Sequence, residues 1–177
     1  MPNTPFLRHD VRTSFYLYDK AGRHVPNWIL EGLELSGHGL LWIPLAVLFA
    51  IWPVIPWKVR ICSLNLTLSF VLDLIVVGAC KLVVRRQRPA YAERRYNATI
   101  IADQYSFPSG HSSRCILIAA MLCVFHMCPL WLVCLSIVWA VLTSLSRVLL
   151  GRHYMLDIIV GGVLGIAVTA IMTKVRP

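Results

Sequence analysis

The sequence contains long stretches without a formal charge, and these constrain its fold more than any other feature. No Asp, Glu, Lys or Arg occurs between Glu34 and Lys58, or between Arg114 and Arg147. From Ile61 to Cys80 the only charged residue is Asp73. A helix of roughly 20 mostly apolar residues is long enough to cross a bilayer. We therefore expect an integral membrane protein rather than a soluble domain.

The charge-free stretch from 115 to 146 is too long for a single crossing of a bilayer. Pro129 lies near its middle, and proline disfavours continuation of a helix. The sequence therefore predicts two helices joined by a tight turn at this point. A further apolar helix is predicted from about Leu156 to Thr173, and its three glycines would allow close packing against a neighbouring helix.

Together these patterns predict an all-α fold, an integral membrane bundle of about five transmembrane helices. We divide the chain into a polar N-terminal segment, residues 1–34, and a transmembrane domain, residues 35–177. Within the N-terminal segment, Pro26 followed by Asn27 indicates the start of a helix. Trp28 is expected to anchor that helix in the membrane interface.

The composition agrees with this class and narrows the partners. Hydrophobic residues make up 58% of the chain and charged residues 14%, so it is more apolar and less charged than a soluble domain. The net charge of +9 comes from basic residues at the edges of the apolar segments, where phosphates of headgroups or of a substrate would meet them. The predicted partners are the lipid bilayer and phosphate groups, not nucleic acid. Nothing in the sequence indicates an oligomeric state.

An up-and-down bundle would bring the polar ends of the apolar segments together. The second segment ends near Lys81, the third begins near His111, the fourth ends near Arg147, and the fifth begins just after His153. In helices of alternating direction these four ends lie on one face of the membrane. A cluster of charged groups at such a face is what a substrate site at the interface would require.

Lys81 and Arg88 form the first candidate pair. They are seven residues apart, nearly two helical turns, so both side chains can face the same way. Arg88 offers a planar fork of donors suited to phosphate oxygens, and Lys81 offers a point charge. The alternative is a basic cluster beside the membrane that binds only headgroups.

The second candidate stretch is Phe107–Ser113, which directly precedes an apolar helical run. The N-terminus of a helix exposes free N–H groups and a positive dipole end, which favour an anion. Ser109 can cap the helix, and Gly110 lets the backbone approach a ligand closely. His111 would then lie in the first turn, where an imidazole can protonate a departing oxygen. The alternative is an ordinary serine cap with a histidine at the interface.

The third candidate stretch runs from Ser146 to Asp157. His153 and Asp157 are four residues apart, so they stack on one face of a helix. A carboxylate bonded to one ring nitrogen would fix the tautomer and make the other nitrogen a better nucleophile. Arg147 can reach a phosphate that is bound beside His153. The alternative is a structural His–Asp pair at the end of a helix.

Asp73 lies within the second apolar segment, about two turns before Lys81. A carboxylate there is costly unless it faces protein or water. We expect Asp73 to make a packing hydrogen bond inside the bundle, and we do not include it in the catalytic set.

These three stretches, in this order, resemble the signature of the type 2 phosphatidic-acid phosphatase superfamily, which includes lipid phosphate phosphatases and vanadium haloperoxidases. The family pattern is Lys, six residues, then Arg-Pro; next Pro-Ser-Gly-His; next Ser-Arg, five residues, His, three residues and Asp. Here these positions are Lys81 to Pro89, Pro108 to His111 and Ser146 to Asp157, with none altered. The likeness extends from about Leu35 to the C-terminus. It implies the helical core shared by acid phosphatases and vanadium haloperoxidases.

The resemblance implies a metal-independent phosphatase that works through a phosphohistidine. His153 attacks phosphorus, Asp157 orients His153, and His111 protonates the leaving oxygen. The phosphoryl oxygens are held by three cations and the start of a helix, namely Lys81, Arg88, Arg147, Ser109 and Gly110. Phosphoryl transfer mainly requires positioning and charge neutralisation, which these groups can supply. No metal or other cofactor is expected, since the six cysteines form no CxxC pair and no carboxylate cluster suits a cation.

The flanking sequence looks most similar to one branch of the family, the polyisoprenoid diphosphate phosphatases, also called presqualene diphosphate phosphatases. Residues 36–42, 103–107 and 146–153 carry this likeness. The predicted substrates are therefore polyisoprenoid diphosphates or monophosphates, such as presqualene or farnesyl diphosphate. Two alternatives stay open. One is a phosphatase for phosphatidate or sphingosine phosphate, and the other is a catalytically silent membrane scaffold, which the intact motifs disfavour.

The distribution of basic residues predicts the orientation in the membrane. The face that carries the site has more of them, with Arg8, Arg12, Lys20, Arg23, Arg85, Arg86, Arg94 and Arg95 on it and Lys58, Arg60, Lys174 and Arg176 on the opposite face. By the positive-inside rule the site faces the cytosol. The resemblance implies the membrane of the endoplasmic reticulum or nuclear envelope. Glycosylation within Asn97–Thr99 would contradict this orientation.

Overall fold

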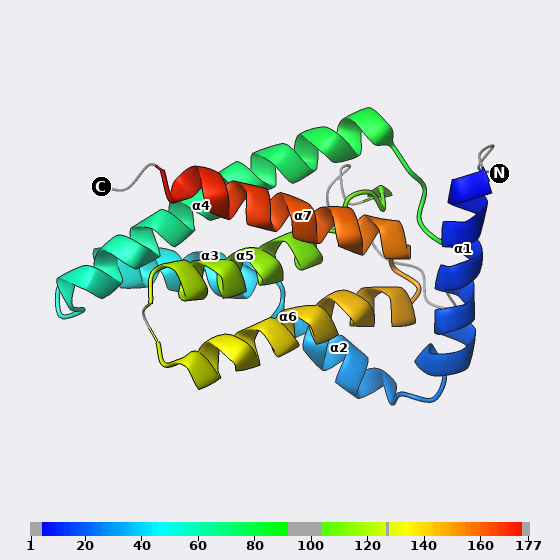
Figure 1. Ribbon diagram of the computed structural model, residues 1–177, viewed down its shortest axis with the longest axis horizontal. Helices are drawn as coiled ribbons and strands as arrows, with labels where there is room; N and C mark the ends of the chain where they lie inside the picture. The colour runs from blue at the N-terminus through cyan, green and yellow to red at the C-terminus, as the bar shows by residue number, and fades with distance from the viewer. Residues whose placement is uncertain (1–4, 92–103, 127, 175–177) are drawn as a thin grey trace.

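The computed structural model describes residues 5–91, 104–126 and 128–174, and in these residues the chain forms a bundle of helices (Figure 1). In chain order the elements are α1 (Pro5–Leu17), the short π-helical turn η1 (Tyr18–Gly22), α2 (Asn27–Ser36), α3 (Gly39–Ile51), α4 (Trp57–Val84), α5 (Gly110–Val124), α6 (Leu130–Leu149) and α7 (Met155–Met172).

The predicted all-α membrane bundle of about five apolar helices is confirmed. Four helical segments of the described residues are long and apolar enough to cross a membrane, namely Asn27–Ile51, Trp57–Val84, Leu130–Leu149 and Met155–Met172. The fifth apolar helix, α5, has only 15 residues. At 1.5 Å per residue it extends about 22 Å, less than the thickness of a hydrocarbon core. Its N-cap, Ser109, is fully buried, so α5 begins inside the bundle.

The boundaries of the helices follow the signals in the sequence. α5 ends at Val124 and α6 begins after Pro129, so the predicted break between the third and fourth apolar segments is present. α2 begins at Asn27, as the Pro26–Asn27 pair indicates. The first apolar stretch is divided at Gly37–His38 into α2 and α3. The predicted domain boundary at residue 34 therefore falls within α2.

The exposed and buried side chains are distributed as a bilayer would require. Large apolar side chains point outward from α4, α6 and α7, among them Val71, Ile75, Val138, Ile159 and Val163. Small polar side chains are buried between the helices, including Asn65, Ser69, Ser113, Thr143 and Ser146. In water such an arrangement would be unfavourable, but in lipid the outward apolar groups cost nothing, and the hydroxyl groups of Ser69, Ser113 and Ser146 donate hydrogen bonds inside the protein.

α5 lies at the centre of the bundle and packs against α7, α6 and α4, and α4 also packs against α3 and α7. The contact between α5 and α7 is close because α7 presents glycines to it. A Cβ atom added at Gly165 would overlap the backbone oxygen of Ser113, and one at Gly161 would overlap that of Ser109. The two glycines therefore set the distance between α7 and the first turns of α5.

The polar ends of the helices lie together at one end of the bundle. Figure 1 shows the end of α4, the start of α5, the end of α6 and the start of α7 on the same side, as the alternating directions predict. α1 runs across this end, next to the start of α7. The turns α3–α4 and α5–α6 lie at the opposite end.

The close contact between α5 and α7 leads to a prediction for Gly165. Gly165→Ala should lower the free energy of unfolding by about 1–3 kcal/mol, because the added methyl group must push two backbones apart. Gly78→Ala in α4 is the matched control, since a Cβ there meets nothing within 4 Å. Thermal unfolding in detergent measures both. Equal melting temperatures for the two variants would contradict this account of the helix contact.

Candidate active site

His153 lies in a tight loop between α6 and α7. The carbonyl oxygen of Arg147 accepts hydrogen bonds from the backbone N–H groups of Arg152 (2.9 Å) and His153 (3.2 Å). Gly151 has φ = 69°, a left-handed conformation that favours glycine. The loop therefore folds back on the end of α6. It places the imidazole inside the bundle, where His153 is only 2% exposed.

The imidazole of His153 is held by a backbone group. Its Nδ1 lies 2.7 Å from the carbonyl oxygen of Ser106. A carbonyl only accepts, so Nδ1 carries the hydrogen and donates it, and Nε2 keeps its lone pair. The Nη1 atom of Arg88 lies 3.4 Å from Nε2 and also donates to the carbonyl of Arg152 at 2.9 Å. Nε2, the nitrogen that can act as a nucleophile, therefore faces the guanidinium of Arg88, a group well suited to binding phosphate.

The position of Asp157 differs from the direct pairing with His153 that the sequence predicts. Its Oδ2 atom is 3.6 Å from His153 Nδ1, which is beyond a hydrogen bond. Oδ2 instead accepts from the backbone N–H of Tyr154 at 2.9 Å, and Oδ1 accepts from Arg86 Nη1 at 2.7 Å. The carbonyl of Ser106 takes the place expected for the carboxylate, which leaves Asp157 as an electrostatic neighbour of the ring and the cap of α7.

The three predicted phosphate-binding cations surround His153. Lys81 and Arg147 are buried, and Arg88 is partly buried. Burial lowers the pKa of His153 well below its usual range, and the positive charges of Arg88, Arg147 and Lys81 lower it further. The hydrogen bond to Ser106 acts in the opposite direction but is weaker. The imidazole is therefore neutral around pH 7, the form in which Nε2 can attack.

Arg147 has a partner that the motifs do not indicate. Its fully buried guanidinium forms an ion pair through Nη1 with Glu34 of α2. Glu34 remains 18% exposed through its side chain. In the absence of an anionic ligand this carboxylate balances the charge of Arg147, so a phosphate entering the site would compete with Glu34 for the same guanidinium.

The turn before α5 has the geometry that its sequence predicts. Ser109 is the N-cap of α5, and its Oγ accepts from the N–H of Ser112 at 3.4 Å and from the hydroxyl of Ser112 at 3.1 Å. Its own N–H donates to the carbonyl of Asp157 at 2.9 Å, which fastens this turn to α7. Gly110, the first residue of α5, is buried beside it.

His111 lies one residue further along α5 and is 8% exposed. Its Nε2 atom is buried and has no hydrogen-bond partner in the part of the chain that the structure describes. Arg147 and His153 are close enough to interact with it electrostatically. Its ring packs edge-on against His38, with 5.3 Å between centroids. His111 and His153 thus share one site, and a polar nitrogen of His111 is left for a ligand.

Asp73 makes the packing hydrogen bond expected of it. Its carboxylate accepts from the hydroxyl of Ser113 and pairs with Arg114 Nε at 3.4 Å. Both partners belong to α5, so the buried acid fixes α5 against α4. No group of three or more His, Cys, Asp or Glu side chains that would hold a metal ion occurs among the described residues.

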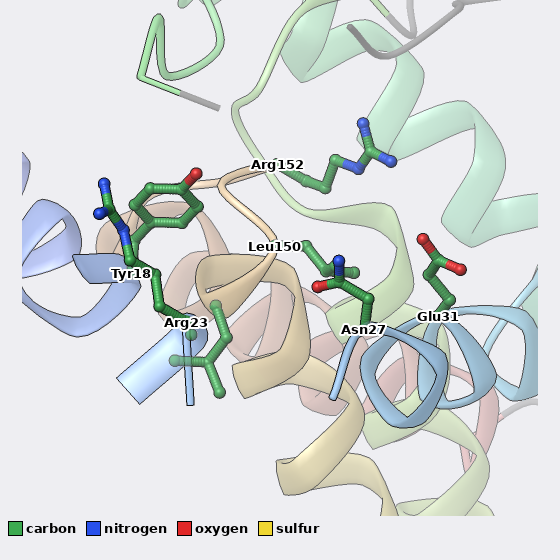
Figure 2. Close-up of a pocket in the computed structure, with 8 residues that line it drawn as sticks. Tyr18, Arg23, Asn27, Glu31, Leu150 and Arg152 are labelled. Atoms are coloured by element: carbon green, nitrogen blue, oxygen red, sulfur yellow. The ribbon is translucent and has the colours of Figure 1, made fainter. Parts of the chain in front are cut away.

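A polar cavity of about 200 Å³ is lined in part by the loop that carries His153. Figure 2 shows Arg152 and Leu150 of this loop facing Asn27 and Glu31 of α2, with Tyr18 and Arg23 closing one side. None of the predicted site residues lines this cavity.

Residues 63–177 match the sequence pattern of a known family, the PAP2 superfamily. These residues contain all three motifs. α1, α2 and α3 precede the matched region. The match thus covers the helices that carry Lys81, Ser109, His111 and Arg147, but not those that carry Asp10 or Glu34.

Two curated proteins and one solved structure are similar to the chain. The "Probable lipid phosphate phosphatase beta" of Arabidopsis thaliana is 33% identical over 187 residues, 92% of this chain and 86% of the relative. The "Undecaprenyl-diphosphatase" of Sulfolobus acidocaldarius is 31% identical over 140 residues, 78% of this chain and 65% of the relative. The crystal structure of the first transmembrane PAP2 type phosphatidylglycerolphosphate phosphatase from Bacillus subtilis has a TM-score of 0.76 at 24% identity, covering 98% of this chain and 87% of that one. This last likeness concerns the fold, which it confirms.

The ion pair of Arg147 leads to a prediction for Glu34. Glu34→Gln should lower the free energy of unfolding by about 3 kcal/mol, because a buried guanidinium loses its partner. Millimolar inorganic phosphate should raise the melting temperature of this variant more than that of the unsubstituted protein, since the anion supplies the missing charge. Asp19→Asn, which breaks an exposed ion pair with Arg23, should do neither. Equal stabilisation of all three proteins by phosphate would show that Glu34 and phosphate do not compete for Arg147.

The lowered pKa of His153 leads to a prediction about stability and pH. The unfolded chain gains a proton on this residue as the pH falls through about 6.5, whereas the folded protein does not. Stability is therefore fully present above pH about 6.5 and is lost below it, at up to about 1.4 kcal/mol per pH unit. The melting temperature should fall more between pH 7.5 and 5.5 for the unsubstituted protein than for His153→Gln. Parallel curves would mean that His153 titrates normally in the folded state.

Proposed function

The chain belongs to the PAP2 superfamily and is a metal-independent lipid phosphate phosphatase of the membrane, and we propose that it cleaves polyisoprenoid diphosphates and monophosphates through a phosphohistidine on His153. The observation that carries the proposal is the environment of His153. Its Nδ1–H is bound to the Ser106 carbonyl, and Nε2 faces Arg88. A neutral imidazole held in this way is an activated nucleophile placed beside an anion-binding group.

In the first step that we propose, the phosphate lies between the cations Lys81, Arg88 and Arg147 and the start of α5. The lone pair of His153 Nε2 forms a bond to phosphorus, and the bond from phosphorus to the leaving oxygen breaks. His111, protonated once the phosphate anion lies beside it, gives a proton to that oxygen. The leaving group is an alcohol from a monophosphate and a lipid monophosphate from a diphosphate. The hydrogen bond to Ser106 stabilises the positive charge that develops on His153.

In the second step a water molecule attacks the phosphorus of the phosphohistidine and gives a proton to His111. The P–N bond breaks, orthophosphate leaves, and both histidines return to their starting states. The cations act in both steps by neutralising the phosphoryl oxygens, which is the main electrostatic requirement of phosphoryl transfer. Asp157 acts through its charge near Nδ1 and through the capping of α7, rather than by a direct bond to the ring.

The proposed substrate class is supported by two kinds of similarity. The sequence around residues 36–42 and 146–153 resembles the polyisoprenoid diphosphate phosphatases. A protein named for undecaprenyl diphosphate is 31% identical over most of this chain. The alternative substrates phosphatidate and sphingosine phosphate share the same phosphoryl group, so the residues around His153 accommodate either class. The choice between them therefore rests on measurement.

We further propose that the site faces the cytosol, in the endoplasmic reticulum or nuclear envelope. Arg8, Arg12, Lys20 and Arg23 belong to the segment at the end of the bundle that carries the site. This excess of positive charge supports a cytosolic site by the positive-inside rule. Asn97 lies outside the described residues, and a glycan on it would reverse the assignment.

The proposed function is tested with protein purified in detergent. Phosphate release from farnesyl diphosphate and presqualene diphosphate should persist in EDTA and fall by at least about 10⁴-fold in His153→Ala, because the nucleophile is lost. Phosphatidate is assayed in parallel. Faster turnover of phosphatidate would keep the mechanism and overturn the substrate class. Absence of phosphate release from all three substrates by a folded protein would favour a silent scaffold.

A further inference from the structure

We propose that Asp10 and Arg86 are positioning residues for His153, so that the N-terminal helix α1 forms part of the catalytic apparatus. This inference rests on the proposed role of His153 as nucleophile. In the first family motif Arg86 lies between the fixed positions Lys81 and Arg88, but it is not itself a fixed position. Asp10 precedes the matched region by more than 50 residues.

α1 caps the start of α7 from outside that helix. The Oδ1 atom of Asp10 accepts from the backbone N–H of Leu156 at 2.9 Å, and the hydroxyl of Ser14 accepts from that of Met155 at 2.9 Å. The first N–H groups of a helix have no partners within it. Here a second helix supplies two of the acceptors. α1 is therefore fixed to the helix that begins directly after His153.

Arg86 joins α1 to Asp157. Its Nη2 atom lies 2.6 Å from Asp10 Oδ2, and its Nη1 atom lies 2.7 Å from Asp157 Oδ1. The side chains of Arg86, Asp10 and Asp157 are 15%, 6% and 0% exposed, so water screens these pairs only weakly. The ring of Tyr154 packs against the guanidinium, 4.0 Å from centroid to Cζ. One planar fork thus bridges two carboxylates in a defined orientation.

The backbone of Arg86 holds the other neighbour of the imidazole. Its carbonyl oxygen accepts from the N–H of Ser106 at 2.8 Å, and the carbonyl of Ser106 accepts from His153 Nδ1. An antiparallel bridge between Gln87 and Tyr105 keeps the two segments in register. Arg86 therefore fixes Asp157 through its side chain and Ser106 through its backbone. Both of these residues lie beside Nδ1 of His153.

Asp10 is the group that keeps the side chain of Arg86 in this place. Without its charge the guanidinium would have one carboxylate instead of two and could turn toward the exposed side. Phe15 and Tyr18 pack against the ring of Tyr91, with centroids 5.2 and 5.1 Å apart. This aromatic contact holds the N-terminal segment independently of the ion pairs. Loss of the Asp10 charge should therefore disturb Arg86 without releasing α1.

The test compares Asp10→Asn, Arg86→Gln and the double variant with Asp19→Asn. Asparagine keeps an oxygen for the N–H of Leu156 but removes the charge that faces Arg86. Asp19 is the matched control, because it is an acid of the same segment paired with Arg23 rather than with the site. For each protein kcat and KM are measured with farnesyl diphosphate as substrate. Inhibition of this reaction by orthovanadate and by inorganic phosphate is measured as well. Orthovanadate imitates the transition state bonded to Nε2, whereas phosphate imitates only the bound anion.

Asp10→Asn should lower kcat about tenfold, because Arg86 then holds Asp157 less firmly beside His153. KM should change less than about twofold. Inhibition by orthovanadate should weaken by a similar factor and inhibition by phosphate should not. The double variant should be no slower than Arg86→Gln, because Asp10 acts through Arg86. Asp19→Asn should match the unsubstituted protein.

Two results would overturn the inference. One is a kcat for Asp10→Asn equal to that of the control, and the other is a double variant whose loss is the product of the two single losses. A parallel weakening of orthovanadate and phosphate would also count against it, since a merely structural disturbance affects both anions. If the unsubstituted protein is itself inactive, the proposed function fails rather than the inference.

Discussion

The hydrogen bond from His153 Nδ1 to the carbonyl of Ser106 is the interaction on which the rest of the site depends. It decides which nitrogen carries the hydrogen and therefore which one has a free lone pair. It also connects the loop after α6 to the segment before α5, two parts of the chain 47 residues apart. Ser106 is held by Arg86, and Arg86 is held by Asp10 and Asp157. The orientation of one ring thus depends on contacts from α1, α7 and the segment after α4.

Two of the arginines at the site have carboxylate partners before any substrate is present. Arg147 is paired with Glu34, and Arg86 is shared by Asp10 and Asp157. Arg88 donates instead to a backbone carbonyl and lies against His153. Buried cations destabilise a protein unless they are compensated. The resting site therefore needs carboxylates, whereas an occupied site needs cations for the phosphate. Glu34, which is partly exposed, is the carboxylate best placed to give way to an incoming anion.

The sequence contained enough information for the helices and for the residues near the phosphate, but not for the contacts between distant segments. Charge-free runs predicted the spans because the bilayer excludes charge over a known thickness. The alternating directions then brought Lys81, His111, Arg147 and His153 to one end. The role of Ser106 could not be predicted, because its backbone carbonyl is the acceptor and every residue has one. The pair of Arg147 with Glu34 and the pair of Arg86 with Asp10 join residues far apart in the chain, and no local periodicity indicates them. The spacing of His153 and Asp157 did suggest a direct bond, but Asp157 caps its own helix instead.

The N-terminal residues contact the transmembrane helices at the end of the bundle that carries the site. The division at residue 34 follows the change in composition, since the polar residues end there and the apolar run begins. Composition, however, reports only where a segment meets water or lipid. Asp10 and Ser14 complete the start of α7, and Glu34 completes Arg147. Each of these contacts satisfies a polar group that the transmembrane helices leave open at their ends. A bundle that gathers so many cations and helix ends at one face needs acceptors from elsewhere in the chain. The first 34 residues supply them at the face where the substrate would enter.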